Sequence, residues 1–124
     1  MAKGDDIRER LVNFAVQVMD LCDELPETAA GKHLSVQLLR SATSAAPNYA
    51  EARGAESSRD FLHKLGIALK ELNESEVWLD MILRRRMGDE ATVLQVRQEC
   101  NELCRILAAS VRTTAAKLGR LRSG

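Results

Sequence analysis

Apolar residues recur at intervals of three and four in four successive segments, and this spacing constrains the fold more than any other feature. In the first segment they are Ile7, Leu11, Phe14, Val18, Leu21 and Leu25. In the last segment they are Val93, Val96, Cys100, Leu103 and Leu107. Alternating threes and fours place side chains on one face of an α-helix. The chain is therefore predicted to form four amphipathic helices, since no segment shows the period-two alternation of a strand.

Turn-forming residues separate the four segments. Pro26, Gly54 and the pair Gly88–Asp89 mark three turns and leave helices at about 5–25, 28–54, 58–87 and 89–120. Such short connections force neighbouring helices to run antiparallel. We expect an all-α, up-down-up-down four-helix bundle in which residues 1–124 form one domain. Only 3% of the residues are aromatic, which argues against a β-sandwich or barrel.

A line of polar residues follows the second and third segments. Arg40, Ser44, Asn48 and Glu51 share one helical face. Antiparallel pairing about a turn near residue 56 sets Arg40 level with about Leu72, within reach of Glu71 and Glu74 on the third segment. We expect a buried or half-buried pair of Arg40 with Glu71 or Glu74, because an unpaired charge near the seam is costly. The alternative is a solvated strip of weak pairs.

The same region resembles a known family. The residues that carry the resemblance are Leu38–Ser41, Ser44, Asn48–Ala52, Ser58–Phe61, Ala68–Glu71 and Trp78–Leu79. They are similar to those of the four-helix-bundle proteins encoded in intervening sequences of bacterial 23S rRNA genes, and to accessory variability proteins of diversity-generating retroelements. The resemblance implies a bundle that assembles with itself into a ring, commonly a homopentamer. It also implies a role with nucleic acid, RNA or DNA.

Charge is the main departure from the nucleic-acid-binding relatives, which are basic. Eighteen basic residues balance eighteen acidic ones here, so the net charge is zero and phosphate attraction is weaker. The predicted bundle nevertheless gathers a net charge of +3 at one end and −3 at the other. The candidate nucleic-acid rim comprises Arg8, Arg53, Arg59, Lys64, Lys117, Arg120 and Arg122. The alternatives are solvated helix ends and a homo-oligomeric scaffold or adaptor without a nucleic-acid partner.

The first and third segments carry more apolar residues than one core stripe requires. The additional residues that we expect at an interface between copies are Val12, Val16, Met19, Leu62, Trp78 and Met81. Wider apolar coverage than about 100° of a helix suggests burial against another subunit. Trp78 is the predicted anchor, because tryptophan is enriched at interface hot spots. The alternative is a broad core.

No pattern of catalytic or metal-binding residues stands out. The only histidines, His33 and His63, are too few for a di-iron bundle, and no phosphate-binding loop or nucleophile elbow appears. We therefore expect no enzyme activity, no cofactor, no metal and no small-molecule substrate. The first twenty residues lack an uncharged core for a signal peptide, and no apolar run approaches the ~18 residues of a membrane span. With three cysteines expected to be reduced, these features favour the cytoplasm and no membrane partner.

Overall fold

Helices make up almost all of the structure. The computed structural model describes the backbone of residues 3–123 and the side chains of residues 4–121. The helices are α1 (Lys3–Glu24), α2 (Ala29–Arg53), α3 (Ser58–Arg84) and α4 (Glu90–Ser123). Every boundary lies within three residues of the predicted one. The predicted all-α fold is confirmed.

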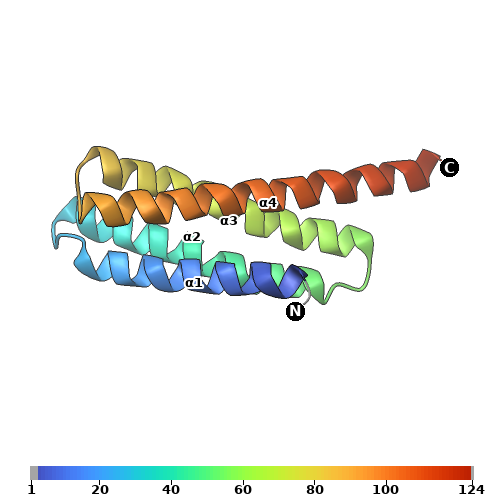
Figure 1. Cartoon of the computed structure of the whole chain (residues 1–124), viewed down its shortest axis with the longest axis horizontal. Helices are drawn as coiled ribbons and strands as arrows, with labels where there is room; N and C mark the ends of the chain where they lie inside the picture. The colour runs from blue at the N-terminus through green and yellow to red at the C-terminus, as the bar shows by residue number, and fades with distance from the viewer. Residues whose placement is uncertain (1–2, 124) are drawn as a thin grey trace.

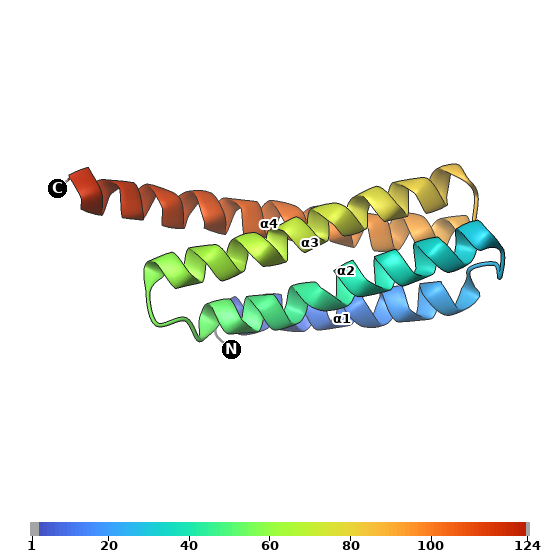
Figure 2. The ribbon, with the colours of Figure 1, turned by 180° about the vertical axis from the view of Figure 1, so that it is seen from behind.

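The helices form an antiparallel up-down-up-down bundle (Figure 1, Figure 2). Connections of four or five residues join them, so each helix reverses the direction of the one before. Each helix packs against two neighbours in the cyclic order α1, α2, α3, α4, and the diagonal pairs make no close backbone contact among the described residues. The α2–α3 contact is the most extensive and the α1–α4 contact the least. The bundle is therefore tight on one side and looser on the opposite side.

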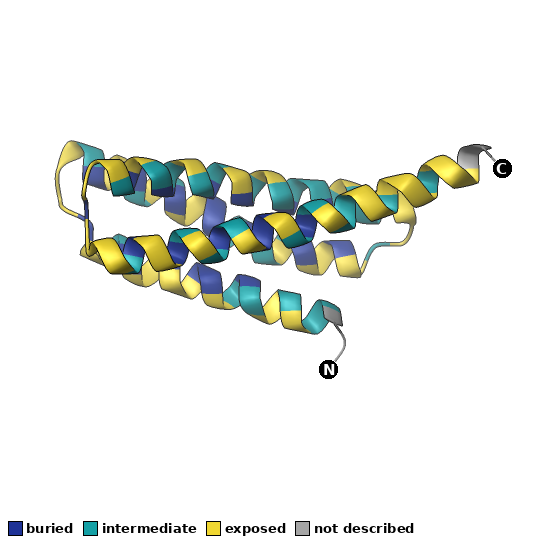
Figure 3. Cartoon of the chain, turned by 45° about the horizontal axis from the view of Figure 1, so that its top comes forward, coloured by how far each residue is buried: buried dark blue, intermediate teal, exposed yellow. Residues whose placement is uncertain are grey.

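The core follows the apolar stripes that the sequence predicted (Figure 3). Its fully buried side chains, none more than 1% exposed, include Leu11, Phe14, Leu21, Leu38, Leu65, Leu72, Leu79, Ile82, Leu103 and Leu107. Ala42 and Ala45 of α2 and Ala68 of α3 are also completely buried. Small side chains let two backbones approach closely, which explains why α2 and α3 pack most extensively.

Side-chain caps begin three of the helices. Thr28 before α2, Ser57 before α3 and Asp89 before α4 each accept the backbone N–H three residues on, at 3.1 Å. These bonds satisfy amides that a helix cannot pair internally. The hydroxyl and amide of Thr92 both donate to Asp89 and lower the pKa of that carboxyl.

Helix α3 ends three residues before the predicted boundary at residue 87. Arg86 adopts a left-handed backbone conformation with φ of 59°, which stops the helix. The N–H of Arg86 then bonds to Leu83 O at 3.1 Å, and that of Met87 to Ile82 O at 3.0 Å. These two bonds define a Schellman motif, in which the residue after the motif packs back onto the helix. Met87 is accordingly buried.

Helix α4 is the longest element, with 34 residues, and its C-terminal end projects beyond the other three helices (Figure 1). The projecting end continues the apolar line of the core through Leu118 and Leu121. Leu121 is 76% exposed, because no other helix of the chain reaches it.

Candidate functional site

Arg40 of α2 reaches across to two carboxylates of α3. Its guanidinium donates to Glu71 Oε2 at 3.4 Å and forms a second, closer pair with Glu74. The side chain of Glu71 is 14% exposed, whereas that of Arg40 is 51% exposed. The arrangement thus lies between the two alternatives that the sequence left open. Water screens the half-exposed cation, so these pairs orient α2 against α3 more than they stabilise the fold.

The other predicted polar residues form two separate contacts. Asn48 Nδ2 donates to the backbone carbonyl of Ser44 at 2.9 Å and to its hydroxyl at 3.1 Å, all within α2. Lys64 Nζ donates to Glu51 Oε2 at 3.2 Å and links α3 to α2. The polar groups in each contact bond to one another. The predicted line from Arg40 to Glu74 therefore forms separate pairs and not one cluster that could hold a ligand.

A buried polar contact that was not predicted lies beside this line. Ser41 of α2 and Ser75 of α3 are fully buried, and their hydroxyl oxygens lie 2.8 Å apart. Serine is mostly exposed in folded proteins, so the residue type alone does not predict a buried contact. The position of both serines on the core side of their helices is the signal that could have revealed the pair.

Carboxylates neutralise three of the seven predicted rim cations. Arg8 pairs with Glu9, Arg53 with Asp5 and, as described above, Lys64 with Glu51. The hydrogen bond from Arg53 to Asp5 raises the pKa of that guanidinium. A paired cation has less charge to offer a phosphate, so these three residues are weak candidates for binding nucleic acid.

The other rim cations are more available. Arg59, Lys117 and Arg120 are exposed and take part in none of the ion pairs between described side chains. The side chain of Arg122 lies outside the described residues. The seven predicted rim residues therefore do not act as one set.

A basic stretch of α4 was also missed. Residues 103–124 contain five basic residues and no acidic one. Two of the five, Arg105 and Arg112, were not predicted, although both are exposed and in none of the ion pairs between described side chains. They lie seven residues apart, about two helical turns, and so share one face. The absence of acidic residues from this part of the sequence is the signal that could have revealed them.

The predicted interface residues divide into two groups. Val16, Met19 and Met81 are 45–48% exposed, whereas Val12, Leu62 and Trp78 are only partly so. Five further large apolar residues are exposed as well: Val36, Leu39, Val77, Leu94 and Leu121. Because exposed apolar side chains on α1, α2 and α3 exceed a scatter of single residues, they define candidate contact surfaces.

Trp78 packs mainly within its own chain. It lies against the core cluster, and the edge of its ring faces His33 with the ring centroids 6.2 Å apart. Its indole Nε1 is buried and has no hydrogen-bond partner among the described residues. This packing leaves less of the ring for another subunit than the sequence prediction assumed.

The three thiols differ in their surroundings, and the hydrogen bond with Cys100 lowers the pKa of Cys104. Burial raises the pKa of Cys22 to about 11. A hydrogen bond with Cys104 and burial both raise the pKa of Cys100. Within the described residues, no three His, Cys, Asp or Glu side chains are arranged to hold a metal ion. None of the described helices combines the length and hydrophobicity needed to cross a membrane.

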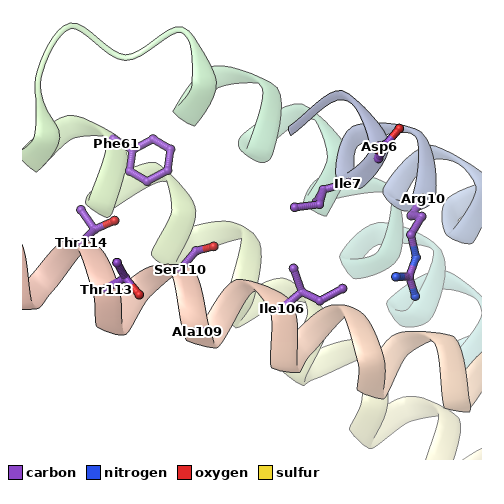
Figure 4. Close-up of a pocket in the computed structure, with 9 residues that line it drawn as sticks. All are labelled: Asp6, Ile7, Arg10, Phe61, Ile106, Ala109, Ser110, Thr113 and Thr114. Atoms are coloured by element: carbon purple, nitrogen blue, oxygen red, sulfur yellow. The ribbon is translucent and has the colours of Figure 1, made fainter. Parts of the chain in front are cut away.

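The α1–α4 side of the bundle contains an open groove of about 590 Å³ (Figure 4). Ile7 of α1, Phe61 of α3 and Ile106 of α4 point into it from three helices. Asp6 lies at the edge, and Arg10 pairs with Glu99 and Glu102 of α4. The surface that lines the groove is predominantly apolar. Among the described side chains that border it, Asp6 has the one charge that takes part in no ion pair.

Comparison with known proteins identifies the family. The profile of the family described as 23S rRNA-intervening sequence protein matches residues 5–109. A crystal structure from Bacteroides thetaiotaomicron VPI-5482, described as a protein with unknown function from the S23 ribosomal protein family, is 32% identical, with a TM-score of 0.76. That match covers 85% of this chain and 97% of the other. Among curated proteins nothing matches. As its resemblance predicted, the chain belongs to the 23S rRNA-intervening sequence protein family.

Proposed function

We propose that this protein is a non-enzymatic accessory factor of the cytoplasm that forms a cyclic homo-oligomer and contacts nucleic acid through the basic face of α4. The observation that carries the proposal is the acid-free stretch of residues 103–124, with its five basic residues. Phosphate neutralisation by exposed cations provides most non-specific affinity for nucleic acid. A locally basic helix can therefore bind even when the whole chain has no net charge.

The exposed apolar residues support the cyclic assembly. One set lies on the adjacent helices α1 and α2 and includes Val16, Met19 and Val36; another lies on α3 and includes Val77 and Met81. Helices α1 and α3 occupy opposite corners of the bundle, so the two sets face different directions. Contact between two different surfaces of identical subunits produces a ring when the rotation closes. The family resemblance makes five the expected number of subunits.

A ring would strengthen the interaction of α4 with nucleic acid. It would present several copies of Arg105 and Arg112 together, and multivalent contact raises affinity without any new interaction within one subunit. The family name refers to 23S rRNA, and this makes RNA the first nucleic acid to test.

Fluorescence anisotropy with labelled RNA and DNA at two salt concentrations tests the proposal. We expect binding to weaken steeply with salt, and Arg105→Ala/Arg112→Ala to reduce the salt slope by about two per subunit engaged. The matched control is Arg84→Ala/Arg85→Ala, which removes two exposed cations at the other end of the bundle. An affinity for RNA and DNA that changes neither with salt nor in Arg105→Ala/Arg112→Ala would contradict the nucleic-acid role.

The exposed apolar surfaces also suit a homo-oligomeric scaffold or adaptor without a nucleic-acid partner. Mass measurement by light scattering on Met19→Lys and Met81→Lys tests the assembly separately from RNA binding. We expect both variants to lower the mass below that of the ring, which contains several chains of 13.7 kDa. Trp78→Ala is expected to weaken assembly more than the exposed change Gln95→Ala. Intact assembly without RNA binding would favour the scaffold.

A further inference from the structure

The projecting end of α4 and the groove between α1 and α4 lie at the same end of the bundle (Figure 1, Figure 4). We propose that this groove receives the projecting α4 end of a second copy of this chain, so that two copies exchange their α4 ends. The proposal does not use the exposed apolar surfaces or the pair Arg105 and Arg112, but it shares Lys117 and Arg120 with the basic stretch of the proposed function. Its test therefore measures the mass of the assembly and not the binding of RNA.

Apolar side chains line the groove and are partly exposed there. The α1–α4 contact is the least extensive of the four helix contacts, and the cavity there measures about 590 Å³. Ile7, Phe61 and Ile106 are only partly buried and point into it (Figure 4). Apolar side chains gain stability when they leave water, so a matching apolar segment would be bound here.

The α4 end has the required shape and polarity. Leu118 and the largely exposed Leu121 continue the line that Leu107 begins in the core. Residues 106–114 of α4 border the groove, and residues 115–123 follow as helix. Residues 115–123 span about 13 Å at the rise of an α-helix and present Leu118 and Leu121 to a partner.

The charges are complementary. Asp6 is exposed at the edge of the groove and takes part in none of the ion pairs between described side chains. Arg10, the cation that also borders the groove, is already paired with Glu99 and Glu102. The incoming α4 end carries Lys117 and Arg120, which a neighbouring Asp6 would attract.

One two-fold axis satisfies both copies. Groove and projection lie at the same end of the chain, and when a two-fold axis relates two copies, the contact that fills one groove also fills the other. This symmetry distinguishes the exchange from the ring contact, which joins different surfaces. Two rings could meet end to end through it, or two single chains could.

Light scattering on the full chain over a dilution series tests the exchange. Leu118→Asp/Leu121→Asp changes two side chains outside the core, and we expect it to raise the dissociation constant of the exchanged pair at least about 100-fold. Asp6→Lys should weaken the pair, and Lys117→Glu/Arg120→Glu in the other copy should restore it. The control Met19→Lys is expected to leave this contact intact, because Met19 lies outside both groove and projection.

Cross-linking identifies the occupant of the groove. A mixture of Ile7→Cys and Leu121→Cys chains should form a disulfide between copies under mild oxidation, whereas a mixture of Ile7→Cys and Val36→Cys chains should not. Circular dichroism establishes that each variant is folded. A mass unchanged by Leu118→Asp/Leu121→Asp, together with no cross-link in the first mixture, would overturn the proposal. The cross-link is measured independently of RNA binding in Arg105→Ala/Arg112→Ala and of ring assembly in Met81→Lys, so failure of the proposed function can be distinguished from failure of the exchange.

Discussion

The hydroxyl oxygens of Ser41 and Ser75 lie 2.8 Å apart in the buried contact between α2 and α3. Ser75 Oγ also donates to the backbone carbonyl of Glu71 at 2.9 Å. Each hydroxyl has one proton, so Ser41 donates to Ser75 when Ser75 donates to that carbonyl. The two helices are thereby joined at one register by a bond that water does not reach.

Replacing both serines of this pair should cost less than the sum of the two single replacements. In Ser75→Ala the hydroxyl of Ser41 loses its partner across the contact and keeps only the carbonyl of Leu38 at 3.3 Å, so we expect the free energy of unfolding to fall by about 1 kcal/mol. Urea denaturation of both single variants and of Ser41→Ala/Ser75→Ala measures the coupling. The double variant should lose less than the sum of the two single losses. Strictly additive losses would show that the hydroxyls do not interact.

The sequence could predict the helices but not this pair, and the reason is register. Helix formation and burial depend on the local spacing of apolar residues, and the repeats that contain Leu11 and Leu103 can be recognised in the sequence. The predicted register set Arg40 level with about Leu72, whereas the structure pairs it with Glu71 and Glu74. Long side chains tolerate an error of a residue or two, so that contact was predictable. Short serine side chains tolerate no such error in register. The groove between α1 and α4 could not be predicted either, because it depends on how far the two helices diverge.

Arg40→Ala should have only a modest effect on the isolated chain. Arg40 is half exposed and water screens its pairs with Glu71 and Glu74, so we expect a loss of no more than about 1 kcal/mol. Urea denaturation at low and high salt measures this, with the loss smaller at high salt. Arg112→Ala, which removes a cation outside the recorded ion pairs, is the control. A loss well above that of a surface pair would show that Arg40 stabilises the core.

Arg86→Gly should stabilise the protein. Arg86 has φ of 59°, a conformation that costs a non-glycine residue about 1–2 kcal/mol and costs glycine almost nothing. We expect a higher melting temperature by circular dichroism. Arg85→Gly is the matched control, because Arg85 has φ of −82° and gains nothing from glycine. If both variants melt below the parent protein, the left-handed turn after α3 is not the source of strain.

Two glycines should respond to alanine in opposite ways. A Cβ atom at Gly31 would lie 1.9 Å from the carbonyl oxygen of Pro26, so Gly31→Ala must displace the turn between α1 and α2. We expect it to cost about 1–3 kcal/mol, as overpacking does. At Gly66 in α3 nothing lies within 4 Å of the added atom, and Gly66→Ala should gain up to about 1 kcal/mol. Thermal melts of the two variants measure both effects; the same sign for both would contradict the local geometry.

Cys22 should react slowly with alkylating agents until the solution is strongly alkaline. Burial raises its pKa from 9.0 to about 11, and the thiolate is the reactive form. At pH 8 the two-unit shift lowers the thiolate fraction about 100-fold relative to an ordinary thiol. The rate of iodoacetamide labelling, followed by peptide mass spectrometry, should rise about tenfold per pH unit between pH 8 and 10 while the protein stays folded. A cysteine placed at the exposed position Gln95 provides the reference thiol. Equal rates for the two at pH 8 would show that Cys22 is not shielded by its contact with α2.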